Sequence, residues 1–94
     1  MITYDSGTLR IIPEGEIDHH TAGKLYNAIR EAVTHELPRN CVMDFSAVSF
    51  CDSSAIALVV RTKRLMDALS GSFNVENLGG QPLKVMRASR LVTC

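Results

Sequence analysis

Short β-prone segments alternate with segments of helical periodicity along this 94-residue chain, and that alternation restricts the possible folds more than any other feature. The first two β-prone pieces are residues 2–4 and 8–12. The sequence DSG between them (residues 5–7) consists of typical turn residues, so the pattern predicts a hairpin. Pro13 and Gly15 then end the second strand or place it near the edge of a sheet.

Residues 18–37 predict the first helix. Asp18 is a suitable N-cap, because its carboxylate can accept hydrogen bonds from the unpaired amides of the first turn. Pro38 and Asn40 close the segment. The apolar side chains recur at spacings of three and four residues and form one stripe: Ala22, Leu25, Tyr26, Ile29, Ala32 and Val33.

The second half of the chain repeats this alternation. Residues 41–45 predict a strand, and Val48 and Phe50 follow on a loop or on an extension of that strand. A second helix is predicted from about Ser53 to Leu69. Its first two turns are apolar all round, which indicates a start in the interior of the protein. The remaining predicted elements are a strand at 72–78, a short helix at 81–89 and a final strand at 91–94.

The predicted order of elements is therefore ββαβαβαβ. Single strands separated by helices favour parallel pairing through crossover connections, while the opening hairpin adds an antiparallel pair. The sequence predicts one α/β domain in which helices pack on a mixed, mostly parallel β-sheet. A length of 94 residues leaves no room for a second core.

Composition and charge exclude several classes of partner and location. Ten basic and ten acidic side chains cancel, so no overall field favours nucleic acid or an anionic membrane surface. The longest apolar run, residues 55–60, is far shorter than the roughly 20 residues that span a bilayer. Residues 1–10 lack the pattern of a secretory signal. Cys41, Cys51 and Cys94 have no CxxC spacing, which predicts reduced thiols in a cytoplasmic protein.

Asp52, Ser53 and Ser54 stand directly before the second helix and permit two interpretations. Asp and Ser are preferred N-caps, so a helix cap is the simpler interpretation and the one that local chemistry favours. Three such residues in a row nevertheless exceed what one cap needs. A phosphate on Ser53 would lie at the positive end of the helix dipole, so the fold could accept its charge. Beside Asp52 the same charge would change the surface potential enough to repel a partner that fits the neutral hydroxyl.

Other groups of chemistry-bearing residues give weaker hypotheses. His19 and His20 are neighbours that point about 100° apart on a helix, which does not suit a shared metal ion. A hydrolase built on Ser53 would lack the Gly-x-Ser-x-Gly elbow, and the pair at residues 79–80 is too short for a phosphate-binding glycine loop. We therefore expect no catalytic residue, no metal site and no cofactor.

Two stretches of the chain resemble a known family. GEIDHHTAGKLYNAI (15–29) and MDFSAVSFCDSSAIALVV (43–60) are similar to the STAS family, and specifically to its bacterial anti-sigma factor antagonists of the sporulation type. In that family a Gly-Glu-Leu-Asp stretch opens the first helix, a strand ends in Asp-x-Ser, and Phe-x-Asp-Ser-Ser-Gly begins the second helix. The resemblance covers nearly the whole chain, so residues 1–94 are expected to form one STAS domain.

The resemblance implies a regulator that binds other proteins and catalyses nothing. Its implied partner is an anti-sigma factor that is also an ATP-dependent serine kinase. The unmodified antagonist binds this partner and frees the sigma factor, phosphorylation of Ser53 dissolves the complex, and a separate serine phosphatase resets it. Asp18 is implied to lie near the phosphoserine and to engage the kinase, whereas nucleic acid, membrane and small-molecule substrates are not implied. The partner-binding residues on this basis are Asp18, His19, Asp52, Ser53, Ser54 and Ala55.

The chain departs from the family pattern at two places. Ala55 replaces the usual glycine, and its methyl group is expected to suit the helix but to narrow the approach of a kinase loop. Family members usually continue beyond the position of Cys94 with a strand and a final helix, so the domain is expected to be short at its C-terminus. The family also includes stress-complex and lipid-trafficking components. A STAS scaffold module without phosphorylation is therefore the alternative function.

Overall fold

A computed structural model describes residues 1–88 of the chain. The last residue of the third predicted helix, the strand predicted at 91–94 and Cys94 lie outside the described residues. The described elements are the strands β1 (Ile2–Asp5), β2 (Thr8–Ile11), β3 (Gly15–Ile17), β4 (Asn40–Asp44), β5 (Val48–Cys51) and β6 (Ser72–Glu76), and the helices α1 (His19–Glu36), α2 (Ser53–Ala68) and α3 (Gly80–Ala88).

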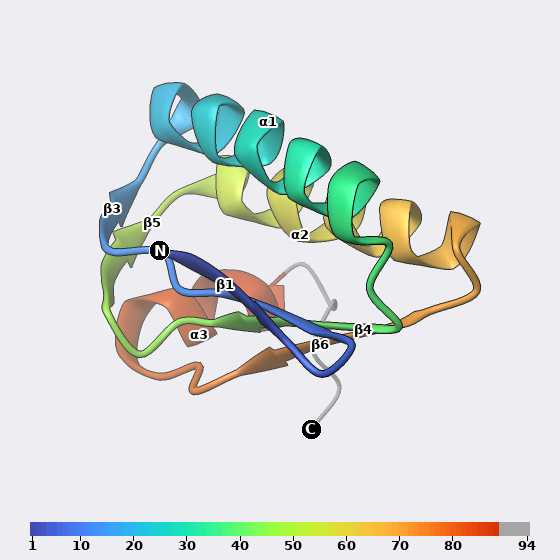
Figure 1. The fold of residues 1–94 in the computed structure, drawn as a ribbon. Coiled ribbons are helices and arrows are strands. Elements are labelled where there is room, and N and C mark those ends of the chain that lie inside the picture. The colour runs from blue at the N-terminus through green and yellow to red at the C-terminus, as the bar shows by residue number, and fades with distance from the viewer. Residues whose placement is uncertain (89–94) are drawn as a thin grey trace.

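The strands form two sheets. The larger has the order β1-β2-β4-β6, in which the β1–β2 hairpin is antiparallel and the other two pairs are parallel. The smaller sheet is a parallel pair of β3 and β5, which continues beyond one end of the larger sheet (Figure 1). The predicted α/β domain with a mixed, mostly parallel arrangement is confirmed. The small sheet was not predicted, because β3 has only three residues and a register shift breaks the alternation of β5.

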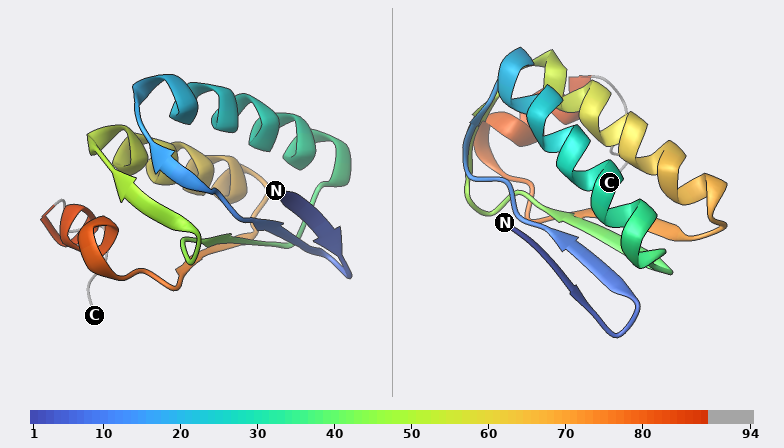
Figure 2. Two further views of the ribbon diagram at one scale, coloured as in Figure 1. Left: turned by 90° about the vertical axis from the view of Figure 1, so that its left-hand side faces the viewer. Right: turned by 45° about the horizontal axis from the view of Figure 1, so that its top comes forward.

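Helices α1 and α2 lie side by side over one face of the larger sheet (Figures 1 and 2). α1 packs on β1 and β2, and α2 packs on β6. Alternate residues of the strands point into this layer, as the two-residue period of a strand requires. The core residues from the central strands are Leu9, Ile11, Cys41 and Met43, each at most 1% exposed. α3 packs mainly against β5 and makes a smaller contact with α2.

The start of α2 is less enclosed than its sequence predicts. Ala55 and Leu58 are buried, but Ile56 and Val60 are only half-buried and Ala57 is exposed. α1 and the sheet cover α2 from two sides and leave a third side toward solvent. The apolar residues all round the first two turns therefore do not indicate complete burial.

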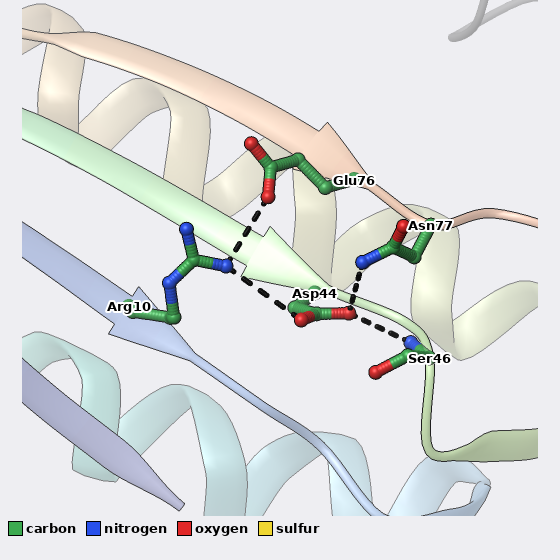
Figure 3. Close-up of polar contacts among 5 residues, drawn as sticks. All are labelled: Arg10, Asp44, Ser46, Glu76 and Asn77. Carbon is green, nitrogen blue, oxygen red and sulfur yellow. Dashed lines mark hydrogen bonds and ion pairs between the residues drawn. The ribbon is translucent and has the colours of Figure 1, made fainter.

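A polar cluster ties together the ends of three strands (Figure 3). The Arg10 guanidinium of β2 lies 3.1 Å from a Glu76 carboxylate oxygen of β6 and 3.6 Å from Asp44 of β4. Asp44 also accepts hydrogen bonds from the Asn77 side-chain amide at 3.0 Å and from the Ser46 N–H at 2.8 Å. The Asn77 hydrogen bond, then the Ser46 N–H and the Arg10 charge, hold the pKa of Asp44 below its ordinary value of 3.8. The cluster fixes the turn that leads from β4 into β5.

Candidate functional site

The small sheet brings the starts of α1 and α2 to one edge of the molecule (Figure 1). β3 and β5 run in parallel, and Ile17 at the end of β3 is paired with Cys51 at the end of β5. Asp18 and Asp52 are the residues that directly follow this pair. The Asp52 N–H donates to the Ile17 carbonyl over 3.2 Å. The two segments that carry the family resemblance therefore meet at the beginnings of two helices.

Asp18 is the N-cap of α1, as predicted. Its carboxylate accepts from the Thr21 N–H at 2.8 Å, and the Thr21 hydroxyl accepts from the Asp18 N–H at 2.8 Å. This reciprocal pair is a capping box. The hydrogen bond from the Thr21 N–H is the main reason that the pKa of Asp18 lies below its ordinary value of 3.8, and the Thr21 side chain adds to it. Asp18 is exposed and thus presents a fixed negative charge at neutral pH.

Asp52 caps α2. Its carboxylate accepts from the Ser54 N–H at 2.8 Å, and its carbonyl accepts from the Ala55 N–H at 3.1 Å. Ser53 is the first residue of α2 and is exposed. Its hydroxyl makes no hydrogen bond within residues 1–88. The cap interpretation is therefore correct for Asp52, while the Ser53 hydroxyl is left available to solvent.

The other expected site residues differ in their access to a partner. His19 is exposed, and Ser54 is half-buried. Ala55 has no exposed surface, so its methyl group lies in the core and not on the surface that a kinase loop would approach. Any effect of Ala55 on a partner would have to act through the packing of α2.

A shallow depression of about 140 Å³ lies between the N-terminal halves of α1 and α2. Beside it, the Arg61 guanidinium of α2 stacks on the Tyr26 ring of α1, 3.7 Å from the ring centre. The stack joins the two helices and leaves a hollow next to the candidate site. The depression is lined by His19, Ala22, Gly23, Tyr26, Ser54, Ala57, Leu58 and Arg61.

Gln81 of α3 supports the site from the other side of β5. Its side-chain oxygen accepts from the Cys51 N–H at 2.9 Å, and its side-chain amide donates to the Cys51 carbonyl at 2.8 Å. The Gln81 side chain thereby makes the two backbone hydrogen bonds to Cys51 that a neighbouring strand would make, and Cys51 directly precedes Asp52. Neither this contact nor the Tyr26–Arg61 stack was predicted from the sequence, because each joins elements that are distant along the chain.

Cys51 lies directly before the candidate site, on β5, and Cys41 lies in the core, on β4. Burial raises the pKa of Cys41 to about 12. Burial also raises the pKa of the Cys51 thiol, and the neighbouring charge of Asp52 adds to the shift. Both thiols are free and buried, so they stay protonated near neutral pH.

Residues 1–88 contain neither a metal-binding cluster nor a membrane-spanning helix. No three histidine, cysteine, aspartate or glutamate side chains of this part of the chain are grouped so that they could hold a metal ion. None of its helices combines the length and the apolar character needed to cross a membrane.

The fold and the paired helix starts define a small α/β domain with an exposed serine at a helix N-terminus, and comparison with known proteins gives the family. Residues 2–93 match the STAS domain family, so the chain belongs to that family. The anti-sigma F factor antagonist of Lysinibacillus sphaericus is 28% identical over 91 residues, which are 97% of this chain and 76% of that protein.

Solved structures of anti-sigma factor antagonists are also similar to this chain. The antagonist SpoIIAA in its unphosphorylated form superimposes with a TM-score of 0.87 at 27% identity, covering 97% of this chain and 80% of that one. The phosphorylated form of the Bacillus cell fate determinant SpoIIAA gives a TM-score of 0.78 at 27% identity, covering 97% and 83%. An antagonist from Mycobacterium paratuberculosis gives 0.84 at 27% identity, covering 97% and 76%.

Proposed function

We propose that this protein is an anti-sigma factor antagonist that binds its anti-sigma factor through the starts of α1 and α2 and is switched off by phosphorylation of Ser53. The observation that carries the proposal is the exposed Ser53 hydroxyl at the beginning of α2, directly after the capping residue Asp52. This hydroxyl has no hydrogen-bond partner among residues 1–88. In this proposal the protein acts in the cytoplasm and catalyses no reaction.

The local electrostatics support a switch at Ser53. A phosphate adds about −1.5 to −2 charge near neutral pH. The dipoles of two helices point their positive ends toward this edge, so the fold can accept the added charge. The carboxylates of Asp18 and Asp52 already stand at those helix ends. A phosphate would therefore make this acidic surface strongly acidic without unfolding it. A partner that packs directly on the hydroxyl would be excluded, because the bulky, strongly hydrated phosphate does not fit in the close contact.

The identity of the proposed partner comes from the related proteins. The relative from Lysinibacillus sphaericus is an anti-sigma F factor antagonist, and SpoIIAA is known in an unphosphorylated and a phosphorylated form. By the family resemblance, the partner of this chain is an anti-sigma factor with serine kinase activity, and a serine phosphatase restores the hydroxyl. Asp18, His19 and Ser54 would contact the partner around Ser53.

Binding measurements with substituted chains test this proposal. The purified kinase-class anti-sigma factor of the same organism is titrated with wild type, Ser53→Ala and Ser53→Asp, with Thr34→Asp as the control for an added charge on exposed α1 surface. We expect Ser53→Ala and Thr34→Asp to bind like wild type and Ser53→Asp to lose at least about ten-fold in affinity, which corresponds to about 1.4 kcal/mol. Equal binding by all four would favour the STAS scaffold alternative instead.

A further inference from the structure

Phe50 is a large apolar side chain at the surface, immediately before the candidate site. Its side chain is 46% exposed and lies three residues before Ser53. Leu37 and Leu69 are also exposed, but they cap the opposite ends of α1 and α2. A single exposed apolar side chain is common on a protein surface. The place of Phe50 directly before the candidate site makes it a candidate contact for a partner.

A β-bulge is what turns Phe50 outward. Gly15 pairs with Val48 and Glu16 pairs with Phe50, so Ser49 is an extra residue on β5 with no counterpart on β3. In a regular strand Val48 and Phe50 would point to the same face. With the bulge, Val48 and Phe50 point to opposite faces: Val48 is 9% exposed and Phe50 is 46% exposed. Bulges commonly re-aim side chains in this way beside functional sites.

The bulge also determines how the site itself is held. It keeps Cys51 inward, with no exposed surface, where Gln81 can bond to its backbone. A regular β5 would instead bury Phe50 and turn Cys51 outward, directly before the cap of α2. The same irregularity thus presents Phe50 at the surface, three residues before Ser53.

The two chain segments that contain β3 and β5 carry acidic charges only. Glu16 is opposite Phe50 in the small sheet. Residues 13–18 and 46–54 contain no lysine or arginine, although the whole chain has no net formal charge. Lys24 of α1 lines a shallow hollow together with Glu14 and Glu16, and Lys84 and Arg87 lie on α3, which packs against β5. The acidic residues of these two segments are Glu14, Glu16, Asp18 and Asp52.

We propose that Phe50 is the apolar anchor of the interface with the anti-sigma factor, and that it enters an apolar pocket of that partner rimmed by lysine or arginine side chains. This inference rests on the proposed function. Aromatic residues in the centre of an interface often dominate its binding energy, while charged residues around them steer association. Three extended residues span about 10 Å, whereas a standard interface covers about 800 Å² on each partner, so one partner can cover both Phe50 and Ser53.

Affinity measurements with Phe50→Ala test the proposal. The probe is the purified kinase-class anti-sigma factor of the same organism, and the matched control is Leu69→Ala, which removes another exposed apolar side chain. We expect Phe50→Ala to weaken binding at least about 30-fold and Leu69→Ala to change it less than about two-fold. Circular dichroism of both variants checks that they are folded.

Glu16→Lys provides a second test that does not alter the ring. The Glu16 side chain is exposed, so its replacement is expected to leave the fold intact. We expect a slower association rate and a weaker dependence of that rate on salt, because the steering charge is reversed. An association rate and a salt dependence equal to those of wild type would contradict the proposed basic rim.

The outcomes separate this inference from the proposed function. If Phe50→Ala binds like wild type while Ser53→Asp does not bind, the anchor is overturned and the switch stands. If Leu69→Ala loses as much affinity as Phe50→Ala, the effect is not specific to Phe50 and the anchor is also overturned. If the wild-type chain itself fails to bind, both are overturned. If Phe50→Ala does not fold, Phe50→Leu and Glu16→Lys decide the question by the same criteria.

Discussion

Asp52 and Ser53 divide two tasks between neighbouring side chains. Asp52 accepts the first-turn N–H of Ser54 and so stabilises the start of α2, whereas the Ser53 hydroxyl has no structural partner within residues 1–88. Capping thus leaves the serine available for modification. The sequence permitted both interpretations of this polar stretch, and the structure assigns the cap to Asp52.

This division predicts unequal effects on stability. Ser53→Ala should lower the free energy of unfolding by no more than about 1 kcal/mol, while Asp52→Ala should lower it by about 1 kcal/mol or more, because it removes the cap. Urea denaturation at neutral pH measures both, with Thr34→Ala as a control at another exposed hydroxyl. A loss of several kcal/mol for Ser53→Ala would mean that Ser53 is mainly structural and would count against the switch.

The caps could be predicted because their chemistry is local. Asp18 and Asp52 each accept from an N–H two or three residues further along the chain, so the necessary information lies within one short segment. The meeting of the two caps could not be derived from local patterns, since it depends on the pairing of Ile17 with Cys51. Only the family resemblance indicated that Asp18 lies near Ser53.

Among the elements, α3 is joined to the site through the side chain of Gln81. Its two hydrogen bonds to the Cys51 backbone are partly buried and hold β5 on the side that β3 does not occupy. Any shift of α3 would therefore displace the residue directly before the cap of α2. α3 thus acts as a support for the site.

Replacing Gln81 tests this support. Gln81→Leu leaves the N–H and C=O of Cys51 without their partner, and we expect a loss of about 1–3 kcal/mol in unfolding free energy. The Cys51 amide should also exchange with solvent deuterium much faster, as followed by NMR. Lys84→Leu, at an exposed position of the same helix, is the control. Unchanged exchange at Cys51 in Gln81→Leu would show that α3 does not hold β5.

The three helices and the strands of the larger sheet were predicted, and the small sheet of β3 and β5 was not. α1 and α2 have enough turns for their apolar spacing and caps to be recognised, and β2, β4 and β6 have the expected alternation. β5 breaks that alternation, since its ends Val48 and Cys51 are both buried. A bulge removes the periodic signal by which a strand is recognised, and so β5 was assigned to a loop or to an extension of β4.

At the scale of the whole molecule, two carboxylates link stability to pH. Asp18 and Asp44 have pKa values below 3.8 in the folded protein because hydrogen bonds favour their charged forms. The unfolded chain therefore binds more protons than the folded one as the pH falls. Their contribution is complete above the unfolded pKa and is lost as the pH falls through the lower folded values.

We therefore expect the midpoint of urea denaturation to fall as the pH is lowered from about 5 to about 2.5. Asp44→Asn should reduce the size of this fall, since its side-chain oxygen can still accept from Asn77 and Ser46 but no longer titrates. Glu31→Gln, at an exposed position of α1, serves as the control. A fall of the same size in Asp44→Asn and wild type would contradict the role assigned to the Asp44 cluster.

The whole account depends most directly on whether Ser53 accepts a phosphate. The decisive measurement is intact mass and peptide mapping after incubation with ATP and the kinase-class anti-sigma factor of the same organism, with Ser53→Ala in parallel. The account predicts one phosphate, located on Ser53 and absent from the substituted chain. No phosphate on the wild-type chain, in the presence of a kinase shown to be active, would contradict the switch and leave a STAS module without this control.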